Sequence, residues 1–185
     1  KQLLDRVIIA YGENGDLHYT LFRPFNWIGP RLDSLEQAQL GNGRVLTIFI
    51  NNLLNNKDIV IVGKGYQTRC FTYIDDGISA LGKIINDESS KLDGKIFNIG
   101  NPKNDTSINE LAELLIDEFE KIFPKKYTGK IIYKTQKEFY GSNYQDIPVR
   151  VPDIKEAENL LNWRPIVSTE EAVRNTLESF IKDFE

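Results

Sequence analysis

A strand that runs directly into a polar loop is the feature that most constrains this chain. Leu17–Phe22 alternates like a half-buried strand, and Arg23–Arg31 follows it with an asparagine, Asn26, before the break at Gly29-Pro30. In open α/β sheets, ligands bind in crevices formed by the loops that follow the carboxyl ends of strands. The pattern therefore predicts a ligand crevice at the end of this strand.

Helix-like and strand-like segments are mixed along the whole chain. Helical spacing of apolar residues predicts helices at residues 2–11, 45–54, 75–85, 108–122, 153–161 and 173–184. Short apolar or extended runs predict strands at residues 58–62, 69–73, 95–99 and 131–133, whereas the polar segment 32–42 carries no firm prediction. Ser107 and Glu110 have the spacing of a capping box, and Ser168 and Glu171 repeat it. The class we expect is α/β.

Composition excludes several classes of function. The 185 residues suffice for one domain or for part of a larger one. A net charge of −4 argues against a nucleic-acid partner, and no apolar run is long enough for a membrane helix. The single cysteine, Cys70, fits a reducing cytoplasm, and the single histidine, His18, makes a His/Cys-rich zinc site unexpected.

The phosphate-binding loop of a dinucleotide domain is missing from the sequence. Neither G-x-G-x-x-G nor G-x-x-G-x-x-G occurs, and Gly63-Lys64-Gly65 is not followed by a helix. The first helix also opens without a capping residue, so it looks cut. We therefore expect that a complete Rossmann domain is not contained in these residues.

Five blocks, taken in their order and spacing, resemble one family. They are residues 22–33, 69–77, 97–102, 140–150 and 161–165. They are similar to the UDP-glucuronic acid oxidative decarboxylase domain of bifunctional polymyxin-resistance enzymes, which belong to the extended short-chain dehydrogenases and act on the route to 4-amino-4-deoxy-arabinose on lipid A. The resemblance spans residues 1–185. It implies the C-terminal part of such a domain: the last Rossmann strands and helices plus the smaller substrate-binding subdomain, without the N-terminal dinucleotide-binding half.

The resemblance also implies catalytic residues. Lys1 matches the lysine of a Tyr-x-x-x-Lys pair that serves catalysis and holds NAD, and the tyrosine would lie four residues upstream. The implied reaction oxidises C4 of UDP-glucuronate and then releases CO₂. Arg150 matches an arginine proposed as proton donor. Because a guanidinium keeps its proton near neutral pH, we expect Arg150 to hold the carboxylate, stabilise the enolate and order a water. Without the resemblance, Arg150 would be an ordinary surface arginine.

The implied substrate-binding residues lie in three places. They are Asn26, the segment Val60, Ile61, Val62, Gly63, Lys64, Gly65, Tyr66, Gln67, Thr68 and Arg69, and Tyr144. Arg69 is the expected diphosphate ligand, since a guanidinium fork matches phosphate oxygens. Val60 and Gly63 replace a family lysine and aspartate, so backbone contacts are expected there.

Several neighbouring residues receive other assignments. Without the resemblance, Asn26 would only form an Asx turn. Arg31 and Arg44 are weaker candidates near the crevice. Packing or structural roles are expected for Trp163, His18 and Cys70.

Other functions remain open at this point. Related enzymes such as UDP-xylose synthases, 4-epimerases and 4,6-dehydratases share the nucleotide grip, and the chain could equally be a non-catalytic nucleotide-sugar-binding fragment. We expect the isolated chain to be inactive, NAD to be bound mainly by the absent half, and the full-length parent to be a homo-oligomer in the cytoplasm. Exposed apolar surface is expected to make the chain self-associate.

Overall fold

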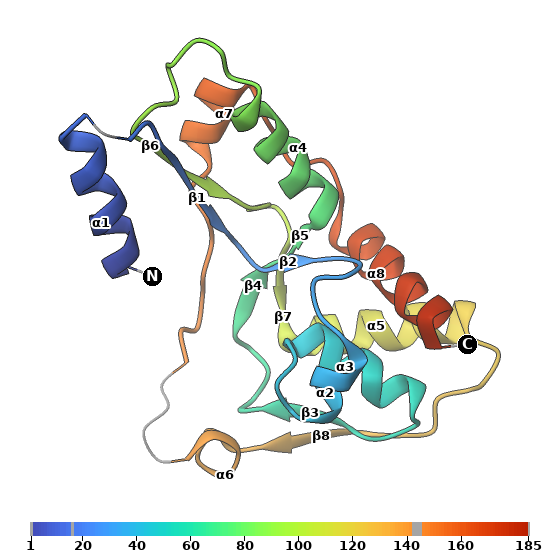
Figure 1. Ribbon diagram of the computed structural model, residues 1–185. Coiled ribbons are helices and arrows are strands. Elements are labelled where there is room, and N and C mark those ends of the chain that lie inside the picture. Colours follow the sequence, from blue (N-terminus) through green and yellow to red (C-terminus); the bar gives the residue numbers. More distant parts are fainter. Residues whose placement is uncertain (1, 16, 142–145, 185) are drawn as a thin grey trace.

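The computed structural model describes residues 2–15, 17–141 and 146–184, and the fold is α/β (Figure 1). The helices are α1 (Gln2–Glu13), α2 (Leu35–Gln39), α3 (Val45–Leu54), α4 (Ile74–Ile85), α5 (Ile108–Ile122), α6 (Gln136–Tyr140), α7 (Lys155–Leu161) and α8 (Thr169–Phe184). The strands are β1 (Thr20–Pro24), β2 (Trp27–Ile28), β3 (Ile59–Val62), β4 (Thr68–Cys70), β5 (Thr72–Tyr73), β6 (Lys95–Ile99), β7 (Asp105–Ser107) and β8 (Ile131–Lys134).

One lobe is built on the parallel pair β1–β6, in which Phe22 lies opposite Phe97. Figure 1 shows α4 and α7 beside this pair. Parallel strands bury their faces under helices, and here the core between strands and helices includes Phe97, Ile99, Leu161 and Trp163. This small core fixes the strand that leads into the Asn-bearing loop.

The second lobe contains the larger core. The parallel pair β3–β8 and the antiparallel pair β4–β7 lie with α3, α5 and α8 around it. The apolar stripe of α5 is buried through Leu111, Leu115 and Phe119, as its helical spacing predicted. The capping box between Ser107 and Glu110 is present at the start of this helix, so that prediction is confirmed.

The short parallel pair β2–β5 joins the two lobes. The backbone N–H of Phe25 donates to Ile99 O at 3.0 Å, and Thr72 N–H donates to Asn26 O at 3.2 Å. Thr72 Oγ1 donates in turn to Phe25 O at 2.9 Å. The loop after β1 is therefore held against β5 and β6 by backbone groups and by the Thr72 hydroxyl, which gives a ligand site here a rigid wall.

The structure differs from the sequence prediction in several elements. The first strand begins at Thr20 and not at Leu17, because the chain before it turns back from α1. The last short helix begins at Lys155, while Asp153 lies outside it and accepts a hydrogen bond from Lys155 N–H at 3.1 Å. Helices α2 and α6 and strand β7 were not predicted, because segments of three to five residues carry too little periodicity.

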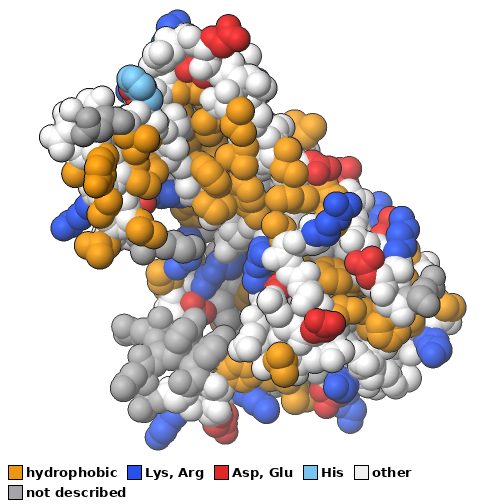
Figure 2. All heavy atoms as spheres, viewed as in Figure 1, with side chains coloured by type: hydrophobic (Ala, Val, Ile, Leu, Met, Phe, Trp, Pro, Cys, Tyr) orange, Lys and Arg blue, Asp and Glu red, His pale blue; other side chains and the backbone are white. Residues whose placement is uncertain are grey.

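Helix α1 stands apart from the rest of the molecule in Figure 1 and has no buried residue. Its apolar side chains are open to solvent, with Leu3 at 74% and Leu4 at 64% exposure. Figure 2 shows further hydrophobic side chains over the face formed by β1, β6 and α4. Among the described residues, no helix is both long and apolar enough to cross a bilayer.

Candidate functional site

A cavity of about 530 Å³ lies where the loop after β1 meets α3, β3 and β4. Its walls are mostly apolar, and a few polar side chains converge on it. This composition is typical of small-molecule sites. The lining residues that the argument uses are Asn26, Arg44, Asn52, Val60, Val62, Gln67, Arg69, Phe139 and Asp146.

Asn26 lines the cavity from the turn between β1 and β2. Its φ of 42° is in the left-handed region, which asparagine tolerates better than most residues. The side-chain Nδ2 donates to Cys70 O at 3.3 Å. The carboxamide oxygen has no protein partner among the described residues, so it is open for a ligand hydroxyl or amide.

Strand β3 presents alternate side chains to the cavity. Val60 and Val62 line it, whereas Ile59 and Ile61 are fully buried in the larger core. This is the period-2 alternation of a strand. Ile61 therefore has only its backbone available to a ligand, while Val60 and Val62 form an apolar wall.

The turn after β3 is built to be tight. Gly65 has a φ of +72°, and a Cβ there would lie 2.0 Å from Asn109 Oδ1. Asn109 donates to Lys64 O at 3.0 Å, and Gln67 closes the turn by donating to Val62 O at 3.0 Å.

Only Gln67 of the 63–68 stretch lines the cavity. Tyr66 and Lys64 are exposed outside it, and Gly63 and Thr68 lie away from the lining as well. Of the 60–69 segment predicted to bind the ligand, four residues therefore line the cavity: Val60, Val62, Gln67 and Arg69.

Arg69 is held in one orientation at the edge of the cavity. Its Nη1 donates to Thr68 O at 2.7 Å and to Ile147 O at 2.8 Å. Its Nη2 donates to Asp146 Oδ1 at 2.6 Å. The Arg69 side chain is 15% exposed and that of Asp146 19%, so the pair is partly shielded from solvent. A preorganised guanidinium is a suitable group for a phosphate or carboxylate ligand.

Arg44 acts as a clamp for the loop that follows β2. Its guanidinium donates to Trp27 O at 2.6 Å and also to Leu32 O. The backbone N–H of Arg44 donates to Asp33 Oδ2 at 2.8 Å. These bonds fold the 27–44 segment onto the cavity. The sequence marked Arg44 as a weak ligand candidate, and its fixed contacts are to backbone carbonyls and to the Asp33 carboxylate of its own loop.

Sequence reasoning missed Asp146, Asn52 and Phe139. Asn52 and Phe139 line the cavity from α3 and α6, and Phe139 remains 47% exposed. Asp146 lies in the motif block at residues 140–150. Nothing in the sequence indicated that its carboxylate pairs with Arg69, the expected phosphate ligand.

Outside Asn26 and the 60–69 segment, three residues were predicted to act at the site. Lys1 and Tyr144 lie outside the described residues. Arg150 is exposed on the coil between α6 and α7 and does not line the cavity. The roles predicted for these three residues stay predictions.

The residues assigned to structural roles are placed accordingly. Trp163 is 2% exposed, and Cys70 is fully buried with a thiol pKa raised to about 11 by burial and by the nearby Asp105 carboxylate. His18 is exposed and pairs with Asp93 at 2.6 Å, which raises the pKa of the imidazole through that hydrogen bond. No group of His, Cys, Asp and Glu side chains able to hold a metal occurs in the described ranges.

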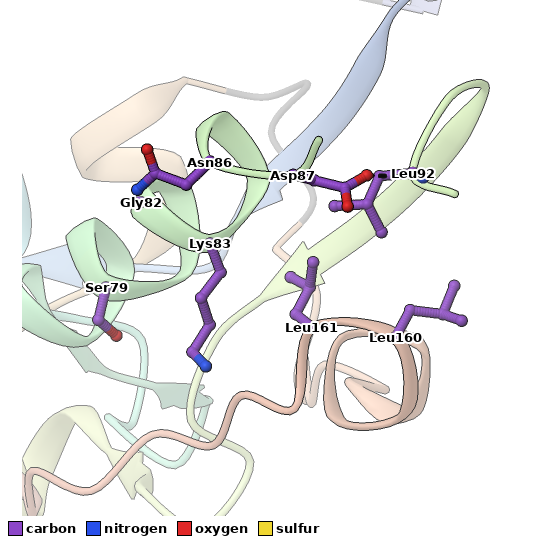
Figure 3. Close-up of a pocket in the computed structure, with 8 residues that line it drawn as sticks. All are labelled: Ser79, Gly82, Lys83, Asn86, Asp87, Leu92, Leu160 and Leu161. Atoms are coloured by element: carbon purple, nitrogen blue, oxygen red, sulfur yellow. Dashed lines mark hydrogen bonds between the residues drawn. The ribbon is translucent and has the colours of Figure 1, made fainter. Parts of the chain in front are cut away.

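A second depression of about 460 Å³ lies between α4 and α7 (Figure 3). Figure 3 shows Ser79 and Lys83 of α4 on one side of it and Leu161 of α7 on the other. Two of its polar side chains already hydrogen-bond within the fold. Asp87 accepts from Ser89 and from Leu92 N–H, and Ser79 Oγ accepts from an indole N–H. None of the predicted site residues lines this depression, so it is the weaker candidate.

Known structures match the chain over nearly its whole length but only half of theirs. PbgP3 from Burkholderia pseudomallei is 41% identical with a TM-score of 0.79, over 97% of this chain and 50% of that chain. UDP-glucose 4-epimerase from Thermotoga maritima, solved with UDP-glucose, is 28% identical with a TM-score of 0.81, over 100% of this chain and 53% of its own. Pal from Bacillus thuringiensis is 30% identical with a TM-score of 0.75, over 98% and 51%.

A family model, that of the NAD dependent epimerase/dehydratase family, matches residues 1–100. The match includes every element from α1 to β6, and with them the loop after β1 and the β3–β4 segment that line the cavity. The chain therefore belongs to the NAD dependent epimerase/dehydratase family.

Proposed function

We propose that this chain is the C-terminal, substrate-binding portion of an NAD-dependent UDP-glucuronate decarboxylase on the lipid A 4-amino-4-deoxy-arabinose route that gives polymyxin resistance. The observation that carries the proposal is the cavity at the loop after β1. It gathers Asn26, Val60, Val62, Gln67 and Arg69 from segments more than thirty residues apart into one site. The whole enzyme's activity, substrate and partners are part of the proposal, because the chain spans about half the length of the matched structures.

The cavity suits a nucleoside diphosphate sugar. Apolar side chains of β3 and α3 offer a surface for a flat base, and Asn52 adds a carboxamide beside it. Arg69 supplies the positive charge that a diphosphate requires. Asn26 can donate and accept, which fits a sugar hydroxyl. The Thermotoga maritima relative was solved with UDP-glucose, which supports a nucleotide sugar as the ligand class here.

NAD is the proposed cofactor, and when bound it would accept the hydride removed from C4 of the sugar. The described residues contain no strand–glycine-rich turn–helix unit of the kind that cradles the pyrophosphate of a dinucleotide. Gly41 and Gly43 do precede α3, but they follow a helix and not a strand. We therefore assign most of the NAD contacts to a dinucleotide-binding half outside these 185 residues.

Arg150 is proposed to act on the substrate carboxylate. Oxidation at C4 makes the sugar a β-keto acid, which loses CO₂ and leaves an enolate that must be protonated to give the UDP-4-keto-pentose. A fixed guanidinium stabilises negative charge at the enolate oxygen and orients a water that delivers the proton. Arg150 lies on the exposed coil between α6 and α7, two residues beyond Pro148, and its contact with the sugar is part of the proposal.

A second candidate is another nucleotide-sugar activity of the same family. The similarity to a UDP-glucose 4-epimerase favours it, because the two activities share the nucleotide site and differ in later chemistry. A non-catalytic nucleotide-sugar-binding role is the further alternative for the chain on its own.

Calorimetry and product analysis test the proposal in two steps. The chain alone is titrated with UDP-glucuronate and with UDP-glucose, and binding at the cavity is expected without turnover. The chain joined to a dinucleotide-binding half of the family is then supplied with UDP-glucuronate and NAD, and a UDP-4-keto-pentose and CO₂ are expected. Absence of UDP-glucuronate binding would sink the site assignment. A product that retains its carboxylate would instead favour the epimerase alternative.

A further inference from the structure

We propose that Asp146 is a positioning residue that orients Arg69 toward a diphosphate bound in the cavity. The inference rests on the proposed nucleotide-sugar function. It names the residue that makes the anion site at Arg69 specific. Asp146 and Arg69 both line the cavity, and their side chains meet at 2.6 Å.

The contacts of Arg69 leave part of its guanidinium open. An arginine side chain has five N–H donors. Both Nη1 hydrogens point to carbonyl oxygens, of Thr68 and of Ile147, and one Nη2 hydrogen is taken by Asp146. The Nε–H and the other Nη2–H have no partner among the described residues. Two donors on one planar group can hold two phosphate oxygens at once.

Asp146 is itself fixed in place. Its Oδ1 accepts from its neighbour's backbone, Ile147 N–H, at 2.9 Å as well as from Arg69. The segment is anchored to β4 by a further backbone bond, in which Thr68 N–H donates to Pro148 O at 2.8 Å. The carboxylate therefore has little freedom to swing away from Arg69.

A fixed partner matters because arginine is a flexible side chain. When the Arg69 side chain is already held in the free protein, ligand binding no longer bears the entropy cost of immobilising it. The carboxylate could in principle compete with a phosphate for the guanidinium. Two donors remain open while Asp146 is bound, so the geometry favours orientation over competition. The two effects predict changes of opposite sign when Asp146 is replaced.

Titration calorimetry with UDP and with uridine separates these effects. Wild-type chain, Asp146→Ala and Asp146→Asn are compared. Asp146→Ala is expected to raise the Kd for UDP by about tenfold or more, the factor of one charge-assisted hydrogen bond. The Kd for uridine, which carries no phosphate, is expected to stay within about twofold of wild type. Asp146→Asn keeps the acceptor without the charge and is expected to fall between.

Asp93→Ala is the matched control. Asp93 forms an equally short ion pair, 2.6 Å to His18, and does not line the cavity. The Asp93→Ala substitution is expected to change the affinity for neither UDP nor uridine. Thermal unfolding of each variant checks that the fold is kept. If the alanine variant does not fold, Asp146→Asn and Asp146→Glu carry the comparison, with the glutamate expected to recover part of the UDP affinity.

Three outcomes would overturn the inference. Tighter UDP binding by Asp146→Ala would make the carboxylate a competitor, and unchanged UDP binding would give it no role. An equal loss for UDP and uridine would make it structural only. Wild-type chain that binds neither ligand would instead defeat the proposed function, and the inference with it.

Discussion

The carboxylate of Asp76, on the first turn of α4, accepts the backbone N–H of Val167 at 3.1 Å. It also accepts Ile166 N–H at 3.1 Å, and the same residue's carbonyl accepts the Trp163 indole at 3.0 Å. Asp76 is only 4% exposed. One residue thus fastens the segment between α7 and α8 to the helix that covers β6.

Replacing Asp76 by alanine is expected to destabilise the chain strongly. It leaves the part-buried N–H groups of Ile166 and Val167 without their acceptor, and the loss of a hydrogen bond to a charged group costs about 1.5–3 kcal/mol. We predict a loss of ~2–4 kcal/mol in the free energy of unfolding, measured by urea denaturation. Asp75→Ala on the same helix turn is the control, because Asp75 is exposed. Equal stabilities of the two variants would contradict this role for Asp76.

Stability is expected to fall in acid because of Glu118. Its side chain is 3% exposed and accepts Arg174 Nε at 2.7 Å and Lys121 Nζ at 2.8 Å. The Arg174 hydrogen bond, opposed by burial, holds the pKa of Glu118 below its usual 4.5. A lowered carboxyl pKa stabilises the folded state above the usual value, and this contribution is lost as the pH falls through the folded-state pKa.

Glu118→Gln is therefore predicted to lower the melting temperature at about pH 7 and to differ less from wild type at about pH 3. Glu113→Gln, at an exposed position of the same helix, is the control. A difference that does not shrink on acidification would show that the ionised form of Glu118 contributes nothing to stability.

Cys70 is predicted to be unreactive in the folded chain. Burial, and then the charge and hydrogen bond of Asp105, raise its thiol pKa to about 11, and the thiolate is the reactive species. As the only cysteine, it gives one labelling signal. Labelling by a thiol reagent near pH 8 is expected to be at least about a hundredfold slower than in urea-unfolded chain. Similar rates in both states would contradict the burial.

Self-association is predicted from the uncovered apolar face. Exposed apolar side chains include Leu3 and Leu4 on α1 and Ile85 on α4, which is 80% exposed, and Figure 2 shows hydrophobic side chains gathered on the side of the molecule in view. Patches of this kind are typical of interfaces. Light scattering is expected to give an apparent mass above 21.3 kDa that falls when both leucines are replaced by serine. A monodisperse monomer would contradict the prediction.

The sequence predicted the longer elements for identifiable reasons. Helix α5 has a capping box and a full apolar stripe, and β3 is a short apolar run, so local pattern sufficed. The partnership of Asp146 with Arg69 and the clamp at Arg44 depend on contacts between residues far apart in sequence. Such contacts leave no local pattern, which is why both were missed. Asp76 lies in the first turn of the helix predicted at residues 75–85, but its bonds to residues 166 and 167 were beyond prediction for the same reason.

The central claim is that a nucleotide sugar binds in the cavity between the β1 loop, α3 and the β3–β4 segment. Backbone amide chemical shifts of the isotopically labelled chain, recorded while UDP-glucuronate is added, test it directly. We predict that the largest changes fall on Asn26, Val60, Val62, Gln67 and Arg69, and that the depression between α4 and α7 stays unaffected. Changes confined to Ser79, Gly82 and Lys83, or no changes at saturating ligand, would contradict the account.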